Sequence, residues 1–468
     1  MQNIVKPERP GGFLDFLPAD YLAREKILKT IEDVFQSFGF DPIETPRIEF
    51  LKTLSGETSD TGKNIFHIKS TLDKNTQDDE PLALAFDHTV PFARILAANP
   101  YDSQKRTGIR LPWRRMVVGP VFRSDTPQSG RYRQFYQFDA DIAGTTSMIA
   151  DAEIVTIMYQ TMKKLGIDNF KIKLNNRKIL NGLAHISNIS ERKDVSKEDI
   201  TKQMMRILDK LDKIGLDKVK NELKASPENS FDPSPCLSDN AVDKIISFIS
   251  IKGNNEEKLD QCKNIFKDIV IAQEGINELY EILEYIKFMG TPVEFVEIDF
   301  SIARGLDYYT GPVMETILLD AMNFGSVFSG GRYNDLVKRF TGKELPATGA
   351  SIGVDRLFAA LKFLNVIDQP SNTVSDLMIL RLDKNYDADY IEMASELRQI
   401  GLNVEFCLLD DTTFKNQFNF AIIKGVKYVL IVGENEFKNK TVQIKNLHSR
   451  VQEEINRDNL VSYIKNII

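Results

Sequence analysis

The sequence predicts a mixed α+β protein with more than one domain, and three observations lead to this fold class. The chain has 468 residues, which is too long for one ordinary core, so two or three domains are expected. Residues 188–286 carry helical patterns rich in Lys and Glu, whereas strand patterns flank them on both sides. Residues 376–468 alternate between strands and helices. This succession is typical of an α+β core with a helical insertion and a separate α/β domain.

The chain opens with a predicted helix followed by extended residues. Apolar side chains recur at helical spacing in residues 22–38, and the pattern ends near Gly39, before Pro42 and Pro46. Residues 116–144 then mix aromatic and polar side chains, which predicts two strands joined by a long, Arg-rich loop.

The middle of the chain is predicted to be helical. In residues 188–286, apolar residues such as Met204 and Leu208 form stripes on segments laced with Lys and Glu. We interpret this part as a helical insertion. Strands return at residues 293–300 and 311–319.

The C-terminal region predicts a small α/β domain with a largely parallel sheet. A helix beginning near Gly353 and a polar break precede it. Two helices, ending near Gly401 and Lys424, alternate with its strands. The expected strands are residues 377–382, 403–409 and 427–432.

Composition argues against several classes of protein. The net charge of −7, from 60 basic and 67 acidic residues, means that any contact with nucleic acid must come from local patches. The three cysteines are widely spaced and the four histidines lack metal-ligand spacing, which disfavours a disulfide frame and a fixed metal site. No segment has the pattern of a secretory signal or a membrane span. We therefore expect a cytoplasmic protein without membrane contact.

The run Arg304–Tyr309, which reads Arg-Gly-Leu-Asp-Tyr-Tyr, predicts a site for a small polar ligand. The Arg304 guanidinium is always charged, and its fork of donors suits carboxylate or phosphate oxygens. If the run is a strand, Tyr308 and Tyr309 point to opposite sides, so that one ring packs inward while the other offers its hydroxyl to a ligand. A tyrosine-rich core strand is the alternative interpretation.

A glycine-rich run, Ser329–Tyr333, follows shortly afterwards. Gly330 and Gly331 would form a turn or let the backbone approach a ligand closely, bringing Arg332 and Tyr333 to the same site. An ordinary hairpin turn explains this run equally well by itself. Together the two runs indicate a ligand site of unspecified chemistry.

The loop within residues 122–137 is rich in arginines, amides and aromatic residues. On a hairpin, Arg123 can hold a phosphate while an aromatic ring stacks on a base, although a solvated basic hairpin is the alternative. Arg304 and Arg356 are further cations, in separate strand and helix contexts. Arginines that converge from three segments would indicate a highly charged ligand, such as a nucleoside triphosphate.

With these motifs together, the chain resembles the histidyl-tRNA synthetases, a family of class II aminoacyl-tRNA synthetases, over nearly its whole length. Lys427–Glu434 is similar to part of the anticodon-binding domain of the same subclass. The other segments that carry the resemblance are Gly39–Pro46, Val121–Gln137 and Gly349–Arg356 for class II motifs one to three, and Arg304–Tyr309 and Ser329–Tyr333 for the two histidine-specific signatures.

The resemblance implies a domain order. A class II catalytic core with an antiparallel sheet would occupy residues 1–187 and 287–367, with a helical insertion at 188–286 and an anticodon-binding domain at 376–468. It also implies a homodimer formed through motif one. The implied substrates are L-histidine, ATP with Mg²⁺, and tRNA(His).

The implied reaction is ATP-dependent ligation of histidine to tRNA(His) through a histidyl-adenylate. Arg123 would hold the α-phosphate and Arg356 the γ-phosphate, while Arg304 would stabilise charge as the histidine carboxylate attacks; these three are the implied catalytic residues. The attacking carboxylate is already ionised, so no side-chain base is required. The implied ATP-binding residues are Arg123, Asp125, Arg131 and Arg356; the implied histidine-binding residues are Asp87, Thr89, Gln137, Asp141, Arg304, Tyr308 and Tyr309; the residues implied to meet the tRNA acceptor end are Thr126 and Gln128.

Some positions have other interpretations or depart from the family pattern. Without the resemblance, Asp87 is best explained as a helix N-cap, and His88 as a surface or capping residue. Thr126 stands where relatives often have Arg, and Ala85 replaces an Arg of the usual Leu-Arg-Tyr-Asp pattern. Neither is a phosphate-clamp position.

Two other functions remain open at the level of sequence. One is a non-catalytic, histidine-sensing regulatory subunit of ATP phosphoribosyltransferase, although such proteins typically lack the C-terminal domain and the Arg304-type cation. The other is a class II synthetase for proline, glycine or threonine, although these lack the Arg-Gly-Leu-Asp-Tyr-Tyr signature.

Overall fold

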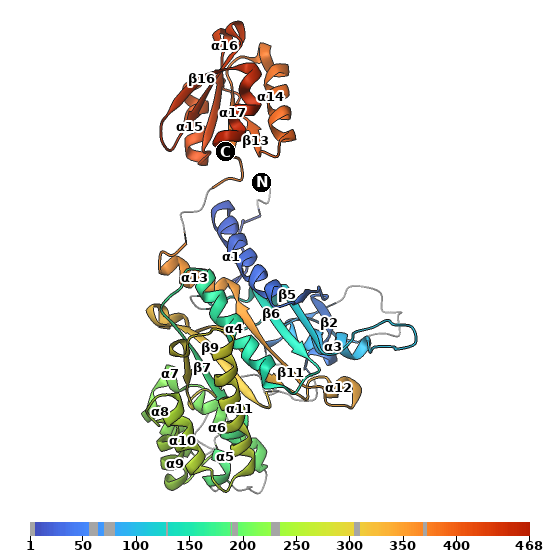
Figure 1. Ribbon diagram of the computed structural model, residues 1–468, viewed down its shortest axis with the longest axis vertical. Coiled ribbons are helices and arrows are strands. Elements are labelled where there is room, and N and C mark those ends of the chain that lie inside the picture. The colour runs from blue at the N-terminus through green and yellow to red at the C-terminus, as the bar shows by residue number, and fades with distance from the viewer. Residues whose placement is uncertain are drawn as a thin grey trace. The chain divides into compact units, whose positions relative to one another are not determined.

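The computed structural model describes residues 5–55, 64–69, 80–127, 130–187, 189, 195–225, 235–303, 309–367 and 372–468. The chain divides into two compact units, drawn in Figure 1. The first comprises Met1–Leu14 and Lys26–Val366, and the second comprises Asp15–Glu25 and Ile367–Ile468. Among the described residues, no helix is both long enough and apolar enough to cross a membrane.

The first unit is built on an eight-stranded sheet with the strand order β1-β5-β6-β11-β10-β9-β7-β8. Neighbouring strands are antiparallel except at the two edges, where β1 is parallel to β5 and β8 is parallel to β7. The sheet and its helices confirm the predicted α+β class. Its strands are β1 (Asp41–Pro42), β5 (Trp113–Phe122), β6 (Gln134–Ala143), β7 (Phe170–Asn176), β8 (Val296–Ile298), β9 (Pro312–Leu318), β10 (Ser326–Tyr333) and β11 (Ala347–Gly353).

Helix α1 (Pro18–Ser37) has the predicted apolar stripe, and it begins at Pro18 rather than Leu22. Proline suits the first turn of a helix because an N–H at that position has no partner within the helix. The stripe is buried, and the ring of Phe35 lies 5.0 Å from the ring of Phe138 in β6. The part of the helix that belongs to the first unit, from Lys26 onward, therefore packs on the sheet of that unit.

A second group of elements surrounds the β1–β5 side of the sheet. Here β2, β3 and β4 form a small antiparallel sheet, and α3 carries several buried apolar residues. The elements are β2 (Ile48–Phe50), α2 (Leu51–Ser55), β3 (His67–Ile68), β4 (Leu82–Leu84), α3 (Thr89–Ala98) and α12 (Lys338–Thr341). Helix α13 (Val354–Phe363) is not part of this group and contacts β6, β10 and β11.

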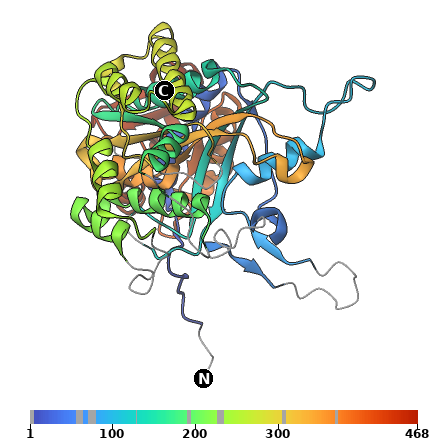
Figure 2. The same ribbon diagram turned by 90° about the horizontal axis from the view of Figure 1, so that it is seen from below.

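The helical middle of the chain gathers at the β7–β8 side, away from the small sheet (Figures 1 and 2). Helix α11 contacts α4 and α5 and so ties these helices to the core. The sequence pattern did not single out α4, which runs beside the central sheet (Figure 1). The helices are α4 (Met148–Lys164), α5 (Arg177–Ile186), α6 (Lys197–Leu208), α7 (Leu211–Ile214), α8 (Leu216–Lys224), α9 (Asp239–Ile249), α10 (Asn255–Ile265) and α11 (Val270–Phe288).

The second unit has a five-stranded sheet in the order β13-β12-β14-β15-β16. The predicted parallel part is confirmed for β13, β12 and β14, but β15 and β16 are antiparallel, so the sheet is mixed. The prediction included neither strand; β16 gives no apolar strand pattern because it is almost entirely exposed and polar. The elements are β12 (Leu377–Arg381), α14 (Asp387–Gln399), β13 (Val404–Phe406), α15 (Phe414–Lys424), β14 (Tyr428–Val432), α16 (Glu434–Asn439), β15 (Thr441–Asn446), β16 (Gln452–Asn456) and α17 (Leu460–Ile467).

Candidate active site

A cavity of about 350 Å³ opens on the large sheet of the first unit. Its volume falls in the range of roughly 300–1,000 Å³ that is typical of small-molecule sites. Gln128, Arg304 and Tyr308 lie outside the described residues, and Thr126 is exposed and does not line the cavity. Nine of the expected site residues do line it: Asp87, Thr89, Arg123, Asp125, Arg131, Gln137, Asp141, Tyr309 and Arg356.

The glycines of the second signature are not in a turn, contrary to expectation, because they lie inside strand β10. The close approach they permit is to other parts of the protein. A Cβ on Gly331 would lie 2.9 Å from Cδ1 of Tyr309, and a Cβ on Gly349 of β11 would lie 2.1 Å from Oδ1 of Asp141. Real Cβ atoms do not approach so closely, so glycine at these positions makes room for the tyrosine ring and the carboxylate.

Arg332 was expected at the ligand site, and this expectation is wrong. Successive side chains of a strand point to opposite faces, and Arg332 pairs on the far face with Asp151 of α4, which is fully buried. Nη1 of Arg332 also donates to the carbonyl of Thr145 at 2.8 Å, and Oγ1 of Thr348 donates to Asp151 at 2.8 Å. Arg332 therefore holds the sheet on its supporting helix.

The position of Asp87 is compatible with both of its interpretations, a cap of helix α3 and a residue that contacts a ligand. Its Oδ1 accepts a hydrogen bond from the backbone N–H of Val90 at 3.2 Å, so it caps the first turn of α3. Its Oδ2 has no hydrogen-bond partner among the described residues, although the side chain is only 3% exposed. Burial raises the pKa of Asp87 to about 7, against the opposing effect of Arg123. One oxygen thus stabilises the helix, while the other is available to a ligand.

Asp141 is held from two sides. Its Oδ1 accepts from the hydroxyl of Tyr333 at 2.6 Å, and its Oδ2 lies 2.6 Å from Nη2 of Arg115. Arg115 is completely buried and stacks 4.4 Å above the ring of Phe92. Burial raises the pKa of Asp141, and the Arg115 charge opposes that effect.

Sequence reasoning missed Arg115 and Asp139, but a signal was present for Arg115. Arg115 and Asp141 are direct cross-strand partners in the β5–β6 hairpin. Pairing the predicted strands around their loop would have placed the two opposite charges together. Asp139 is buried in β6 and lines the cavity, and burial raises its pKa too.

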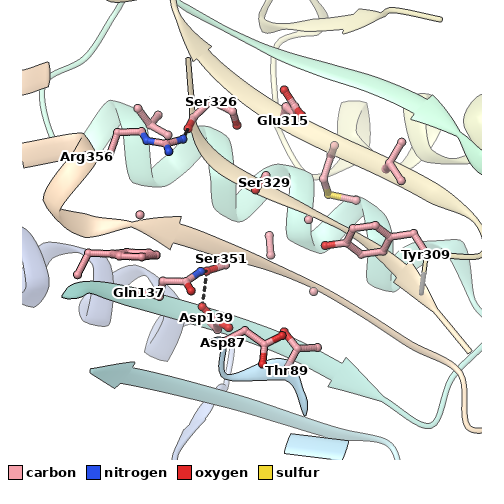
Figure 3. Close-up of a pocket in the computed structure, with 18 of the residues that line it drawn as sticks. Asp87, Thr89, Gln137, Asp139, Tyr309, Glu315, Ser326, Ser329, Ser351 and Arg356 are labelled. Atoms are coloured by element: carbon pink, nitrogen blue, oxygen red, sulfur yellow. Dashed lines mark hydrogen bonds between the residues drawn. The ribbon is translucent and has the colours of Figure 1, made fainter. Parts of the chain in front are cut away.

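Arginines occupy another part of the cavity. Arg123 donates from Nε to the carbonyl of Phe86 at 3.0 Å and from Nη2 to Oε1 of Gln137 at 3.2 Å. Arg356 donates from Nη1 to the carbonyl of Ser326 at 2.7 Å. Figure 3 shows Arg356 and Tyr309 approaching the cavity from opposite ends. The cavity therefore has a guanidinium at one end and a phenol at the other, while Arg123 lies next to Asp87 and Gln137.

Tyr309 lies just before β9 rather than within a strand. Burial raises the pKa of its hydroxyl, and the nearby carboxylates of Asp141, Asp139 and Asp87 raise it further. The hydroxyl therefore remains protonated and can donate a hydrogen bond at neutral pH.

Of the two expectations for His88, a surface or a capping residue, the first is wrong because His88 is only 1% exposed. It does occupy the N-cap position of α3, but its side chain makes no capping hydrogen bond. Its Nδ1 lies 3.1 Å from Nη1 of Arg47 and its Nε2 lies 3.2 Å from the carbonyl of Gly119. Burial and the Arg47 charge lower its pKa to about 3. The neutral ring accepts at Nδ1 from Arg47 and donates at Nε2 to Gly119, which fixes the turn between Asp87 and Thr89. It does not line the cavity.

Comparison with known proteins gives two family matches. The model of the family described as histidyl-tRNA synthetase matches residues 12–357, and that of the anticodon-binding domain matches residues 376–467. The histidine–tRNA ligase of Clostridium tetani is 37% identical over 469 residues, which cover 99% of each chain. That of Helicobacter pylori strain P12 is 36% identical over 96% of each chain.

Solved structures share the fold. The chain resembles the crystal structure of histidyl-tRNA synthetase from Nostoc sp. PCC 7120 with a TM-score of 0.82 and 31% identity, covering 99% of this chain and all of the other. An ATP phosphoribosyltransferase regulatory subunit/histidyl-tRNA synthetase from Bacillus halodurans has a TM-score of 0.69 over 89% of this chain and 97% of its own. At 21% identity, the second likeness concerns the fold alone.

Proposed function

The chain belongs to the histidyl-tRNA synthetase family and is a histidine–tRNA ligase, and from this premise we propose that the ligation runs through a histidyl-adenylate formed in the cavity. Its substrates are histidine, ATP and tRNA(His). The observation that carries the proposed mechanism is that arginines, buried carboxylates and the Tyr309 phenol line one cavity, with Arg356 and Tyr309 at opposite ends. Such a cavity suits a triphosphate beside an amino acid with a basic side chain.

Asp87, Thr89 and Gln137 would hold the histidine α-ammonium group. The carboxylate of histidine must lie near the α-phosphate for attack, so the ammonium group should lie near Arg123. Asp87 fits this place, since Arg123 is bonded to the carbonyl of the preceding residue, Phe86. The Oδ2 of Asp87, which has no partner within the described part of the chain, would accept from the ammonium.

Asp141, Tyr308 and Tyr309 would select the imidazole. Asp141 lies four residues beyond Gln137 on the same face of β6, which is roughly 13 Å further along the strand. Tyr333 and Arg115 hold its carboxylate in place. An acceptor from Asp141 and a donor hydroxyl from a tyrosine can satisfy the two nitrogens of a neutral imidazole.

Arg123, Asp125, Arg131 and Arg356 would bind ATP, with Arg123 on the α-phosphate and Arg356 on the γ-phosphate. Arg304, by its place in the first signature, would stabilise the charge that develops as the carboxylate attacks. These arginines act by position and fixed charge, so the step needs no side-chain base.

Mg²⁺ would enter as part of the ATP substrate. No cluster of three or more His, Cys, Asp or Glu in the described part of the chain could hold a metal ion by itself. The carboxylates of Asp125 and Glu315 line the cavity, and oxygen donors of this kind fit Mg²⁺ that keeps most of its ligands from phosphates and water.

The remaining partners follow from other parts of the chain. Residues 376–468 would bind the anticodon of tRNA(His), and Thr126 and Gln128 would meet its acceptor end. Motif one would form a homodimer; β1 lies at the sheet edge, and Ile48 and Phe50 nearby are exposed. Residues 1–187 with 287–367 would form the catalytic core and 188–286 the insertion. We place the protein in the cytoplasm, as a component of protein synthesis.

The match of residues 376–467 to an anticodon-binding domain favours the synthetase over the regulatory subunit. Histidine-dependent exchange between ATP and pyrophosphate, followed by aminoacylation of tRNA transcripts, tests the proposal. Exchange with histidine, but not with proline, glycine or threonine, is expected. Pure protein that binds ATP but supports no histidine-dependent exchange would refute it.

The tRNA step needs a separate assay. Transcripts of tRNA(His) with and without the extra 5′ nucleotide would show whether the protein recognises this nucleotide although it has Thr126 where relatives often have Arg. Equal charging of both transcripts would show that the chain does not read this nucleotide.

A further inference from the structure

Two cavity residues without a role so far, Asp139 and Ser351, complete a chain of hydrogen bonds. Arg123 donates from Nη2 to Oε1 of Gln137 at 3.2 Å. Nε2 of Gln137 then donates to Oγ of Ser351, and Oγ of Ser351 donates to Oδ1 of Asp139. Figure 3 shows Gln137, Ser351 and Asp139 next to one another in the cavity. These hydrogen bonds join Arg123, which directly follows β5, and two residues of β6 to a residue of β11.

Arg123 at one end and Asp139 at the other fix the direction in which the hydrogen bonds of this chain are donated. A guanidinium can only donate hydrogen bonds, so the amide oxygen of Gln137 must face Arg123. The amide NH₂ group then faces Ser351, whose oxygen accepts and whose proton must go to an acceptor on the other side. The Asp139 carboxylate supplies that acceptor. Neither Ser351 nor Gln137 can reverse its orientation without breaking the chain at one end.

Gln137 places this chain of hydrogen bonds between the two proposed subsites. Under the proposed function, on which this step rests, Gln137 contacts histidine and Arg123 contacts the α-phosphate of ATP. A shift of either side chain is transmitted to the other through the bond between them, and Ser351 and Asp139 fix the amide plane that makes the bond. Other restraints on Arg123, such as the Phe86 carbonyl, do not involve Gln137.

We propose that Ser351 and Asp139 are positioning residues that couple the histidine subsite to the ATP subsite. Histidine that engages Gln137 would set Arg123 for the α-phosphate, and ATP would do the reverse with equal strength, because coupling between two sites is reciprocal. Replacing Ser351 with Ala removes the middle of the chain while leaving both subsites their own contacts. The affinity for each ligand would then no longer depend on whether the other is bound.

Titration calorimetry with histidinol tests this directly, since the amino alcohol lacks the carboxylate and forms no adenylate. In the full-length protein, saturating histidinol is expected to tighten ATP binding by roughly 5- to 150-fold, the usual range for coupled sites. The ratio of the ATP dissociation constants without and with histidinol should fall to about 1 in Ser351→Ala. A wild-type protein without coupling, or a variant that retains it, would overturn the proposal.

Thr348→Val is the matched control. Thr348 lies on the same strand, and its Oγ1 likewise donates to a buried aspartate, Asp151, but on the face away from the cavity. In this variant, histidinol should tighten ATP binding as much as it does in the wild-type protein. Loss of coupling in both variants would mean that β11 was merely disturbed, which would also overturn the proposal.

Two substitutions at Asp139 distinguish its role as a hydrogen-bond acceptor for Ser351 from the effect of its negative charge. Asp139→Asn retains an oxygen for the Ser351 hydroxyl and should keep most of the coupling, whereas Asp139→Ala should lose it. Equal loss in both would show that charge, rather than positioning, matters. Histidine-dependent exchange by the wild-type protein is measured in parallel: exchange without coupling refutes only this inference, whereas absence of exchange refutes the proposed function.

Discussion

Replacement of Asp87 by Asn is expected to stabilise the unliganded protein and to weaken histidine binding. Asn keeps an oxygen that can accept from the N–H of Val90, so the start of α3 is preserved. The group at the Oδ2 position becomes an uncharged NH₂. In the wild-type protein that oxygen is buried and has no hydrogen-bond partner within the described residues. Burial therefore disfavours the charge of Asp87 by more than Val90 and Arg123 stabilise it.

The size of the effect follows from the pKa of Asp87. Its value of about 7, compared with an ordinary 3.8, is a difference of about 3, and each pKa unit corresponds to about 1.4 kcal/mol. Between these two values the folded protein holds a proton that the unfolded chain has lost, so stability falls as pH rises and levels off above pH 7. Asn does not titrate. The advantage of Asp87→Asn should therefore grow from near zero around pH 4 to roughly 4 kcal/mol above pH 7.

Urea unfolding can measure this in the first unit alone, because the single tryptophan of the chain, Trp113, lies in β5. Between pH 5.5 and pH 8, the stability difference between variant and wild type should widen by about 2 kcal/mol. The histidine KM in the exchange assay should rise by roughly 10- to 150-fold, which is the loss of one hydrogen bond to a charged group. A stability difference that does not change with pH, or an unchanged KM, would refute this account of Asp87.

Three further outcomes are expected. Arg332→Met leaves Asp151 buried without its cation, which should cost about 3–5 kcal/mol of stability in Trp113-monitored urea unfolding; altered histidine or ATP KM values at unchanged stability would contradict its placement behind the sheet. Tyr333→Phe removes a donor to Asp141 and should raise the histidine KM by roughly 10- to 100-fold with little effect on the ATP KM, so equal effects on both would count against a role in histidine selection. Arg304→Ala should slow single-turnover adenylation far more than it weakens equilibrium ATP binding, because its charge would act on the transition state; comparable losses would exclude that role.

Regular local patterns made part of the fold predictable. The apolar stripe of α1, with Ile27 and Ile31 among its buried residues, repeats at helical spacing and needs no tertiary information. The parallel strands β12 and β14 are continuous apolar runs. By contrast, β16 carries a polar, exposed sequence, and only its pairing with β15 makes it a strand.

The site was predictable where a motif fixes a residue type, and not where long-range geometry decides. Arg123 and Arg356 stand in motifs and do line the cavity. Arg332 stands in a motif as well, but strand alternation turns it toward Asp151. The glycines beside it looked like a turn because a turn and a crowded strand both require glycine. Their neighbours in the fold, which are the flanking strands β9 and β11 and the Tyr309 ring, distinguish the two.

The antiparallel pairing of β6 with β11 has a consequence for how the protein is made. Gln137 and Ser351, which meet across these strands, are 214 residues apart in the chain. Closing so long a loop is entropically slow, and contacts of high sequence separation form late in folding. On the ribosome, the β5–β6 hairpin emerges long before its partner strand, with its cavity-facing carboxylates Asp139 and Asp141 still open to water. The active site is therefore among the last parts of the first unit to form, and a chain truncated before β11 cannot contain it.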